Sequence, residues 1–240
     1  MYPNDEQSGG KPAVSPWGAL VKVIMEPAAT FEALRDRMPV LPGYVLQMVV
    51  LAAVLAVTLP NALNMTADLL SKQAGVTPQM MSITKTFSIV GGVVGSLATP
   101  WVAGVVVAAF AIFFGQFQGG GVRFSSYLGM IGYARLPLVL SAIVSTPLTM
   151  QAKTLQQVQN FSISLAVLLP PDANRYLKAF FQTLNPFDLW YYALLVIGFA
   201  ALHRVKPARS LWFVVSIYGL SLLLALGSAA LAGKTPGLGM

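Results

Sequence analysis

Long apolar runs, separated by short polar stretches, form the pattern of this chain. A helix needs roughly 20 apolar residues to cross the hydrocarbon core of a bilayer. Five runs approach or exceed this length, at residues 44–63, 87–117, 127–150, 187–203 and 211–231. Three of them contain no charged residue, and the third and fourth contain one each, Arg135 and Asp188. The pattern predicts an all-α fold, a polytopic membrane helix bundle with five transmembrane helices.

The residues around the five runs divide the chain into further parts. Residues 1–14 are rich in Gly, Pro and polar side chains and predict a flexible tail. Residues 15–39 predict two short amphipathic helices, because apolar residues recur at helical spacing on both sides of Pro27. These apolar positions are Trp17, Leu20, Val21 and Ile24 in the first helix and Phe31, Leu34 and Met38 in the second. Residues 40–233 then form the transmembrane domain, and residues 234–240 a short C-terminal tail.

Composition agrees with a membrane protein and limits the possible functions. Hydrophobic residues make up 56% of the 240 residues and charged residues 10%, whereas an average soluble domain is about a quarter charged. The absence of cysteine excludes a disulfide framework and a thiolate metal site. The net charge of +7 is scattered over the ends of the runs. We therefore expect no nucleic-acid partner.

Lys and Arg residues set the expected orientation, because the cytoplasmic flanks of membrane helices carry an excess of them. With five spans, nine of the fifteen Lys and Arg residues fall on the side of the N-terminus. We expect the N-terminus in the cytoplasm and the C-terminus outside. The amphipathic helices at 15–39 are then cytoplasmic, and two arrangements suit them: on the membrane surface, or packed against the protein's own loops.

A charged residue inside an apolar run is a candidate functional residue, because it is costly in the membrane. Arg135 lies in the third run, and we expect it to be partly embedded near the inner leaflet. Two interpretations are open: the side chain reaches out to the headgroups, or it binds a lipid phosphate or a protein partner. Tyr133, Arg123 and Arg204 are further candidates for lipid or partner binding.

Small residues and prolines indicate where the helices pack or bend. The second run contains Gly91, Gly92 and Gly95. Gly91 and Gly95 are four positions apart, a spacing that lets membrane helices approach closely. Pro100 in the second run and Pro137 in the third predict bends, because proline has no N–H for the helix. Proline bends occur along aqueous paths and also in ordinary bundles.

The fourth run begins with residues typical of a helix start. Asn185 precedes Pro186, which predicts Asn185 as the N-cap and places Asp188 near the positive end of the helix dipole. His203 is the one histidine, so no metal site or catalytic triad is expected around it. No phosphate-loop, GxSxG or HExxH pattern occurs. We expect neither a cofactor nor enzymatic activity.

Three stretches together resemble the Yip domain family, membrane proteins whose eukaryotic members are named for interacting with Ypt/Rab GTPases. They are residues 26–31 (EPAATF), residues 119–137 (from GGGVRF to GYARLP) and residues 185–190 (NPFDLW). The resemblance covers residues 17–230. It implies five transmembrane helices, a cytoplasmic N-terminus, a short outer C-terminus and a non-enzymatic role in membrane organisation or traffic through protein partners.

The chain differs from the eukaryotic members in one respect. It has no segment like the Asp-Leu-Tyr-Gly-Pro stretch that they carry before the first span, so Rab-GTPase binding is not expected. The chain looks more like a bacterial relative, located in the cytoplasmic (inner) membrane. We expect a lipid-handling protein or a scaffold, with membrane lipids, protein partners or further copies of itself as partners. A small-solute transporter or channel is the alternative.

Overall fold

The computed structural model describes residues 14–71, 75–153, 157, 163–170 and 172–232. The predicted tails, residues 1–14 and 234–240, lie outside the described residues except for Val14. The described part of the chain is helical and contains no strand. Its helices are α1 (Gly18–Met25), α2 (Pro27–Leu34), η1 (Arg35–Arg37), α3 (Leu41–Ser71), α4 (Pro78–Gln116), α5 (Phe124–Ala134), α6 (Leu136–Gln151), η2 (Leu165–Leu168), α8 (Arg175–Gln182), α9 (Pro186–His203) and α10 (Pro207–Ala232).

Five helical segments are long and apolar enough to cross a membrane, which confirms the predicted five-span bundle. They are α3, α4, the pair α5 and α6 (Phe124–Gln151), α9, and α10 as far as Leu231. The helices α3 and α4 run beyond the apolar centres into more polar sequence. Helix α4 begins at Pro78, after Thr77. The Thr77 side chain caps this end of the helix by accepting a hydrogen bond from the Met80 N–H.

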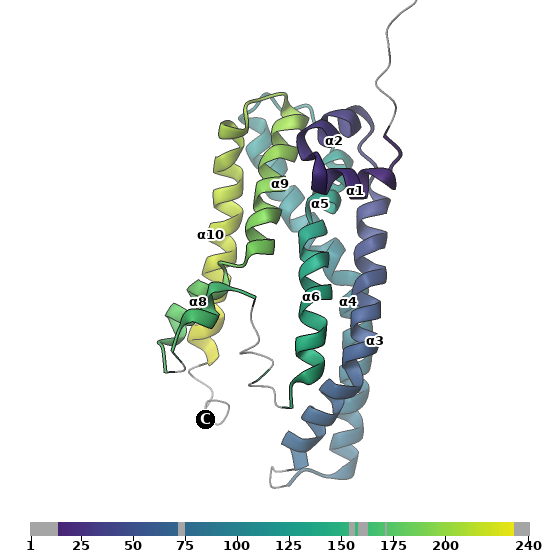
Figure 1. Ribbon diagram of the computed structural model, residues 1–240, viewed down its shortest axis with the longest axis vertical. Helices are drawn as coiled ribbons and strands as arrows, with labels where there is room; N and C mark the ends of the chain where they lie inside the picture. The colour runs from purple at the N-terminus through teal and green to yellow at the C-terminus, as the bar shows by residue number, and fades with distance from the viewer. Residues whose placement is uncertain (1–13, 72–74, 154–156, 158–162, 171, 233–240) are drawn as a thin grey trace, which may run out of the picture.

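The bundle is arranged around α5, which contacts α3, α4 and α9 (Figure 1). The helices α3, α4 and α6 lie on one side, and α9 packs against α10 on the other. Across one end lie α1, which contacts α5, and α2, which contacts α9. The loop before Arg123 and the turn at Arg204 come together with η1 at this end, which we call the α1/α2 end. Helix α8 packs against η2 and α10 towards the opposite end.

The short helices α1 and α2 pack against helices of the bundle, and two of the four predicted apolar positions of α1, Leu20 and Ile24, pack against the core. Ala19 and Val23 are fully buried, whereas Trp17 and Val21 are 57% and 69% exposed. The small Ala19 side chain lets α1 lie close to its neighbours, while Trp17 and Val21 face outward. In α2, Phe31 is fully buried as expected.

The third span is interrupted at Arg135. Helix α5 ends at Ala134 and α6 begins at Leu136. The reason is Pro137 in the first turn of α6, which has no N–H to continue the helical hydrogen bonds. The bend predicted at Pro137 is therefore a break between two helices. Pro100 lies buried inside α4, which continues through it.

Glycines allow two close approaches around the start of α3. A Cβ atom on Gly43 would lie 2.5 Å from the carbonyl oxygen of Gly132 in α5. A Cβ atom on Gly104 of α4 would lie 2.8 Å from Cζ of Tyr44. The Tyr44 ring also stacks on Trp101 of α4, with the ring centroids 4.2 Å apart. The start of α3 is thus held between α4 and α5.

Candidate lipid-binding site

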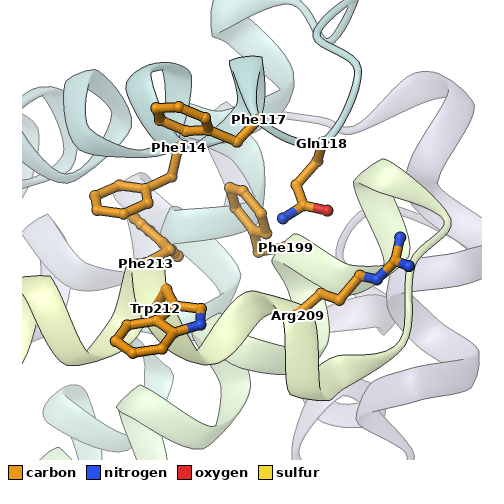
Figure 2. Close-up of a pocket in the computed structure, with 7 residues that line it drawn as sticks. All are labelled: Phe114, Phe117, Gln118, Phe199, Arg209, Trp212 and Phe213. Carbon is orange, nitrogen blue, oxygen red and sulfur yellow. The ribbon is translucent and has the colours of Figure 1, made fainter.

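A cleft opens between the ends of α4, α9 and α10 that lie at the α1/α2 end of the bundle (Figure 2). Its volume is about 250 Å³, and most of its lining is apolar. We call it the aromatic cleft. Its lining residues are Phe114, Phe117, Gln118, Phe199, Arg209, Trp212 and Phe213.

The aromatic rings form a buried floor and an exposed rim. Phe199 and Phe213 are each 1% exposed, and their rings stack with centroids 4.7 Å apart. Phe114 lies against Phe213, with a centroid distance of 6.1 Å. Phe117 and Trp212 are 71% and 74% exposed. An apolar floor with an exposed aromatic rim favours the binding of hydrocarbon.

Polar groups occupy one side of the aromatic cleft. Figure 2 shows Gln118 and Arg209 on this side and the rings of Phe114, Trp212 and Phe213 on the other. Arg209 lies in the first turn of α10 and is exposed. It forms no ion pair with any described residue. A guanidinium can bind phosphate oxygens with two parallel N–H groups, so the cleft places a group suited to an anion beside apolar groups suited to hydrocarbon.

Three arginines surround Asp36 at the same end of the bundle. Nε of Arg35 lies 3.5 Å from the Asp36 carboxylate, and Nη2 of Arg204 lies 4.0 Å from it. Arg123 lines the same surface cavity, which has a volume of about 200 Å³. Exposed ion pairs contribute only about 0–1 kcal/mol to stability. This basic cluster, with three positive charges and one negative charge, is better suited to binding anions than to stabilising the fold.

Unusual backbone conformations position the basic cluster. Arg204 ends α9 in the left-handed region, with a φ of 55°. The loop before Arg123 has positive φ angles of 98°, 64° and 78° at Gly119, Gly120 and Gly121, which L side chains rarely adopt. The GGGVRF motif therefore forms the turn that brings Arg123 to Arg204, two of the four predicted binding residues.

The other two predicted binding residues lie elsewhere. Tyr133 is fully buried, and its hydroxyl donates a hydrogen bond of 2.7 Å to the carbonyl of Pro16. It thereby ties the segment before α1 to α5. Arg135 is partly exposed, and its Nε donates a hydrogen bond of 2.8 Å to Oε1 of Gln47. Because Gln47 is buried, this bond directs the Arg135 side chain into the bundle.

The predicted packing glycines are used only in part within the described chain. A Cβ atom on Gly92 would lie 3.0 Å from Cδ1 of Leu55 in α3, so Gly92 lies at a helix contact. Cβ atoms on Gly91 and Gly95 would meet open space. Close packing at these two glycines stays a prediction. The buried stripe of α4 consists of Pro100, Gly104, Val107, Ala108, Ala111 and Gly115.

The start of α9 has the geometry of a capped helix. Oδ1 of Asn185 accepts a hydrogen bond of 2.9 Å from the Phe187 N–H, and Asn185 is the N-cap. Asp188 lies in the first turn. No ion pair joins it to Arg135 among the described residues. Asp188 lies at the opposite end of α9 from Phe199 of the aromatic cleft.

Sequence reasoning missed the aromatic cleft, although two local signals point to it. Phe114 and Phe117 are one helical turn apart at the end of a span, and Trp212 and Phe213 closely follow Arg209. Aromatic and basic residues at span ends are typical of the membrane–water interface. Only the fold shows that these two groups face each other.

Comparison with known families places these features in one domain. Residues 21–229 match the Yip1 domain. The chain belongs to the Yip1 domain family. Its Yip1 domain includes the aromatic cleft and the basic cluster, and with its five apolar helices it is an integral membrane protein. No curated protein and no solved structure matches the chain.

Proposed function

We propose that this Yip1-domain protein is a non-enzymatic, lipid-handling scaffold of the bacterial cytoplasmic membrane, with its α1/α2 end in the cytoplasm. The aromatic cleft carries the proposal. In this orientation the cleft opens at the inner leaflet and takes up an acyl chain of an anionic phospholipid over Phe199 and Phe213. Arg209 pairs with the headgroup phosphate.

Charge and exposure at the α1/α2 end support this orientation. Arg35, Arg123 and Arg204 share one surface cavity, and cations beside anionic headgroups gain about 1 kcal/mol each. Trp17 and Val21 are both exposed and lie one turn apart on α1. Such an apolar helix face suits the interfacial region of a bilayer. Helix α1 then lies between the membrane surface and the bundle. In this position it does not cover the basic cluster, which stays accessible to lipids and protein partners.

Native mass spectrometry of the protein in a mild detergent tests the proposal. The probes are phosphatidylglycerol and a diacylglycerol with the same acyl chains, which differ only in the phosphate headgroup. We expect the protein to retain phosphatidylglycerol preferentially. Replacing Arg209 by glutamine should reduce this retention about tenfold, because a hydrogen bond to a charged group contributes about 1.5–3 kcal/mol. Trp212→Ala should weaken the retention of both lipids, because hydrocarbon contact is lost.

The matched control is Arg175→Gln. Arg175 is also an exposed arginine in the first turn of a helix, but it lies on α8, towards the opposite end of the bundle (Figure 1). Its substitution should leave lipid retention unchanged. Equal phosphatidylglycerol retention by wild type and Arg209→Gln would exclude the aromatic cleft as the lipid site.

A further inference from the structure

Two short helices, η2 and α8, form a unit on the side of α10, apart from the aromatic cleft. The Leu165 N–H at the start of η2 donates a hydrogen bond of 3.1 Å to the carbonyl of Leu184, just after α8. Helix α8 contacts both η2 and α10. We call η2 and α8 together the α8 platform.

Helix α8 is amphipathic. It begins after Asn174, whose Oδ1 accepts a hydrogen bond of 2.8 Å from the Tyr176 N–H and caps the helix. At helical spacing, the apolar and aromatic residues fall on one side and the polar residues on the other. The apolar side has Tyr176, Leu177, Phe180 and Phe181, and the polar side has Arg175, Lys178 and Gln182.

The apolar side of α8 is turned away from the bundle. The buried residue of α8 is the small Ala179, whereas Tyr176, Leu177 and Phe180 are exposed. In η2, Leu168 is 74% exposed. A contiguous apolar surface of this kind marks a site of contact with a membrane or a partner. The depth of the α8 platform in the bilayer decides between these two.

Helix α10 gives a first measure of this depth. Thr183 is the C-cap of α8, and its hydroxyl shares a hydrogen bond of 3.1 Å with the hydroxyl of Tyr218. Tyr218 lies near the middle of the fifth span, which runs from Pro207 to Leu231. The rise from Pro207 to Tyr218 is about 17 Å at 1.5 Å per residue, and the hydrocarbon core is about 30 Å thick. The end of α8 therefore lies within the depth of the hydrocarbon core.

Helix α9 gives a second, independent measure. It has 18 residues, from Pro186 to His203, and is therefore about 27 Å long, slightly less than the thickness of the hydrocarbon core. Its His203 end leads into the exposed turn at Arg204, at the α1/α2 end. The Pro186 end therefore does not pass the far boundary of the core. Because α8 closely precedes Pro186, the α8 platform lies at this boundary, beside the half of α10 that is farther from the α1/α2 end (Figure 1).

Lipid already surrounds this half of α10. Leu223 and Leu224 are exposed there on a helix that spans the membrane, and the α8 platform packs against the same helix. An amphipathic helix with aromatic and aliphatic residues on one side and cations on the other typically lies at the boundary between headgroups and acyl chains, with its apolar side buried about 5–10 Å. Helix α8 has this composition and this depth.

We propose that the α8 platform is an interfacial anchor, whose exposed apolar residues contact the acyl chains of the leaflet farther from the α1/α2 end. The polar side of α8 lies at the level of the headgroups, where Cζ of Arg175 is 5.1 Å from the centroid of the Tyr176 ring. Contact with acyl chains selects no particular headgroup. The anchor thus depends on neither Arg209 nor the aromatic cleft, and it holds the start of the short α9 at the membrane boundary.

Spin labels on single cysteines measure this placement, because the chain has no cysteine of its own. The variants are reconstituted at full length in vesicles of phosphatidylcholine and phosphatidylglycerol. Power saturation then compares collisions of the label with oxygen, which is enriched in hydrocarbon, and with nickel(II) ethylenediaminediacetate, which stays in water. We expect labels at Leu168→Cys and Leu177→Cys to collide with oxygen and to be shielded from the nickel complex, as a label at Leu223→Cys on α10 is.

The matched control is Arg175→Cys, an exposed position on the polar side of the same helix. Its label should collide readily with the nickel complex. Circular dichroism identifies any variant that does not fold, and the two test positions lie in different helices, so that one serves if the other misfolds.

Three results would overturn the proposal. Frequent collisions with the nickel complex at Leu168→Cys or Leu177→Cys would place the α8 platform in water. Shielding of these labels from both reagents would show that protein, such as a second copy of the chain, covers the apolar side. Equal collision rates at Leu177→Cys and Arg175→Cys would exclude an interfacial position. None of these results affects the proposed function, which depends on Arg209, and loss of that function would leave the anchor unchanged.

Discussion

Substituting Gly43 by alanine tests how closely α3 and α5 pack. The added Cβ atom would lie 2.5 Å from the carbonyl oxygen of Gly132. Because this neighbour is backbone, no flexible side chain can move aside, and the two helices must separate. Their separation also lengthens the 3.1 Å hydrogen bond from Gln47 to the Gly132 carbonyl.

The magnitude follows from three opposing effects. Overpacking of a close contact costs about 1–3 kcal/mol, and loss of the buried amide bond adds about 1 kcal/mol. Alanine recovers up to about 1 kcal/mol through its higher helix propensity than glycine. We expect Gly43→Ala to lower the free energy of unfolding by about 1–3 kcal/mol.

Unfolding by sodium dodecyl sulfate in mixed micelles, followed by circular dichroism, measures this change. Gly91→Ala is the matched control, because a Cβ atom there meets open space and Gly91 also lies inside a membrane helix. Its stability should stay the same or rise slightly. If Gly43→Ala and Gly91→Ala unfold at the same detergent fraction, the backbone contact between α3 and α5 does not exist as described.

Three further substitutions test single contacts. Tyr133→Phe removes the bond to the Pro16 carbonyl and should speed hydrogen exchange in α1 about fivefold, since about 1 kcal/mol is lost; unchanged exchange would contradict this tie. Arg204→Gly should be about 1 kcal/mol more stable than Arg204→Ala in denaturant unfolding, because glycine adopts a φ of 55° without strain; equal stabilities would argue against a strained turn. Asn185→Ala should lower stability by about 1 kcal/mol in thermal unfolding, because the cap bond to Phe187 is lost; an unchanged transition would show that the cap contributes nothing.

The five spans could be predicted because a bilayer selects long apolar segments, and this selection acts on each segment alone. The start of α9 was predictable for a similar reason, since the Asn185 cap and Pro186 act within one turn. The sequence left open what a neighbouring helix decides. Ala19 rather than Trp17 faces the bundle, because the space beside α1 depends on helices that come later in the chain.

The candidate sites show the same limit. Arg135 was recognisable as an unusual charge, but Gln47 lies 88 positions before it, and no local pattern joins them. Gly43 has no sequence signal of its own, because its importance comes from Gly132 across the contact. Residues within one turn are readable from sequence, whereas contacts between spans require the fold.

The burial of Phe31 has a consequence for how the chain is made. Its ring lies beside Gly198 of α9, roughly 170 residues later in the chain. A ribosome adds about 5–20 residues per second, so the partner of Phe31 emerges roughly 10–30 s after it. During that time α2 exposes an aromatic side chain that a chaperone or the insertion machinery can bind. Helix α2 therefore reaches its final position only after the fourth span, α9, has been made.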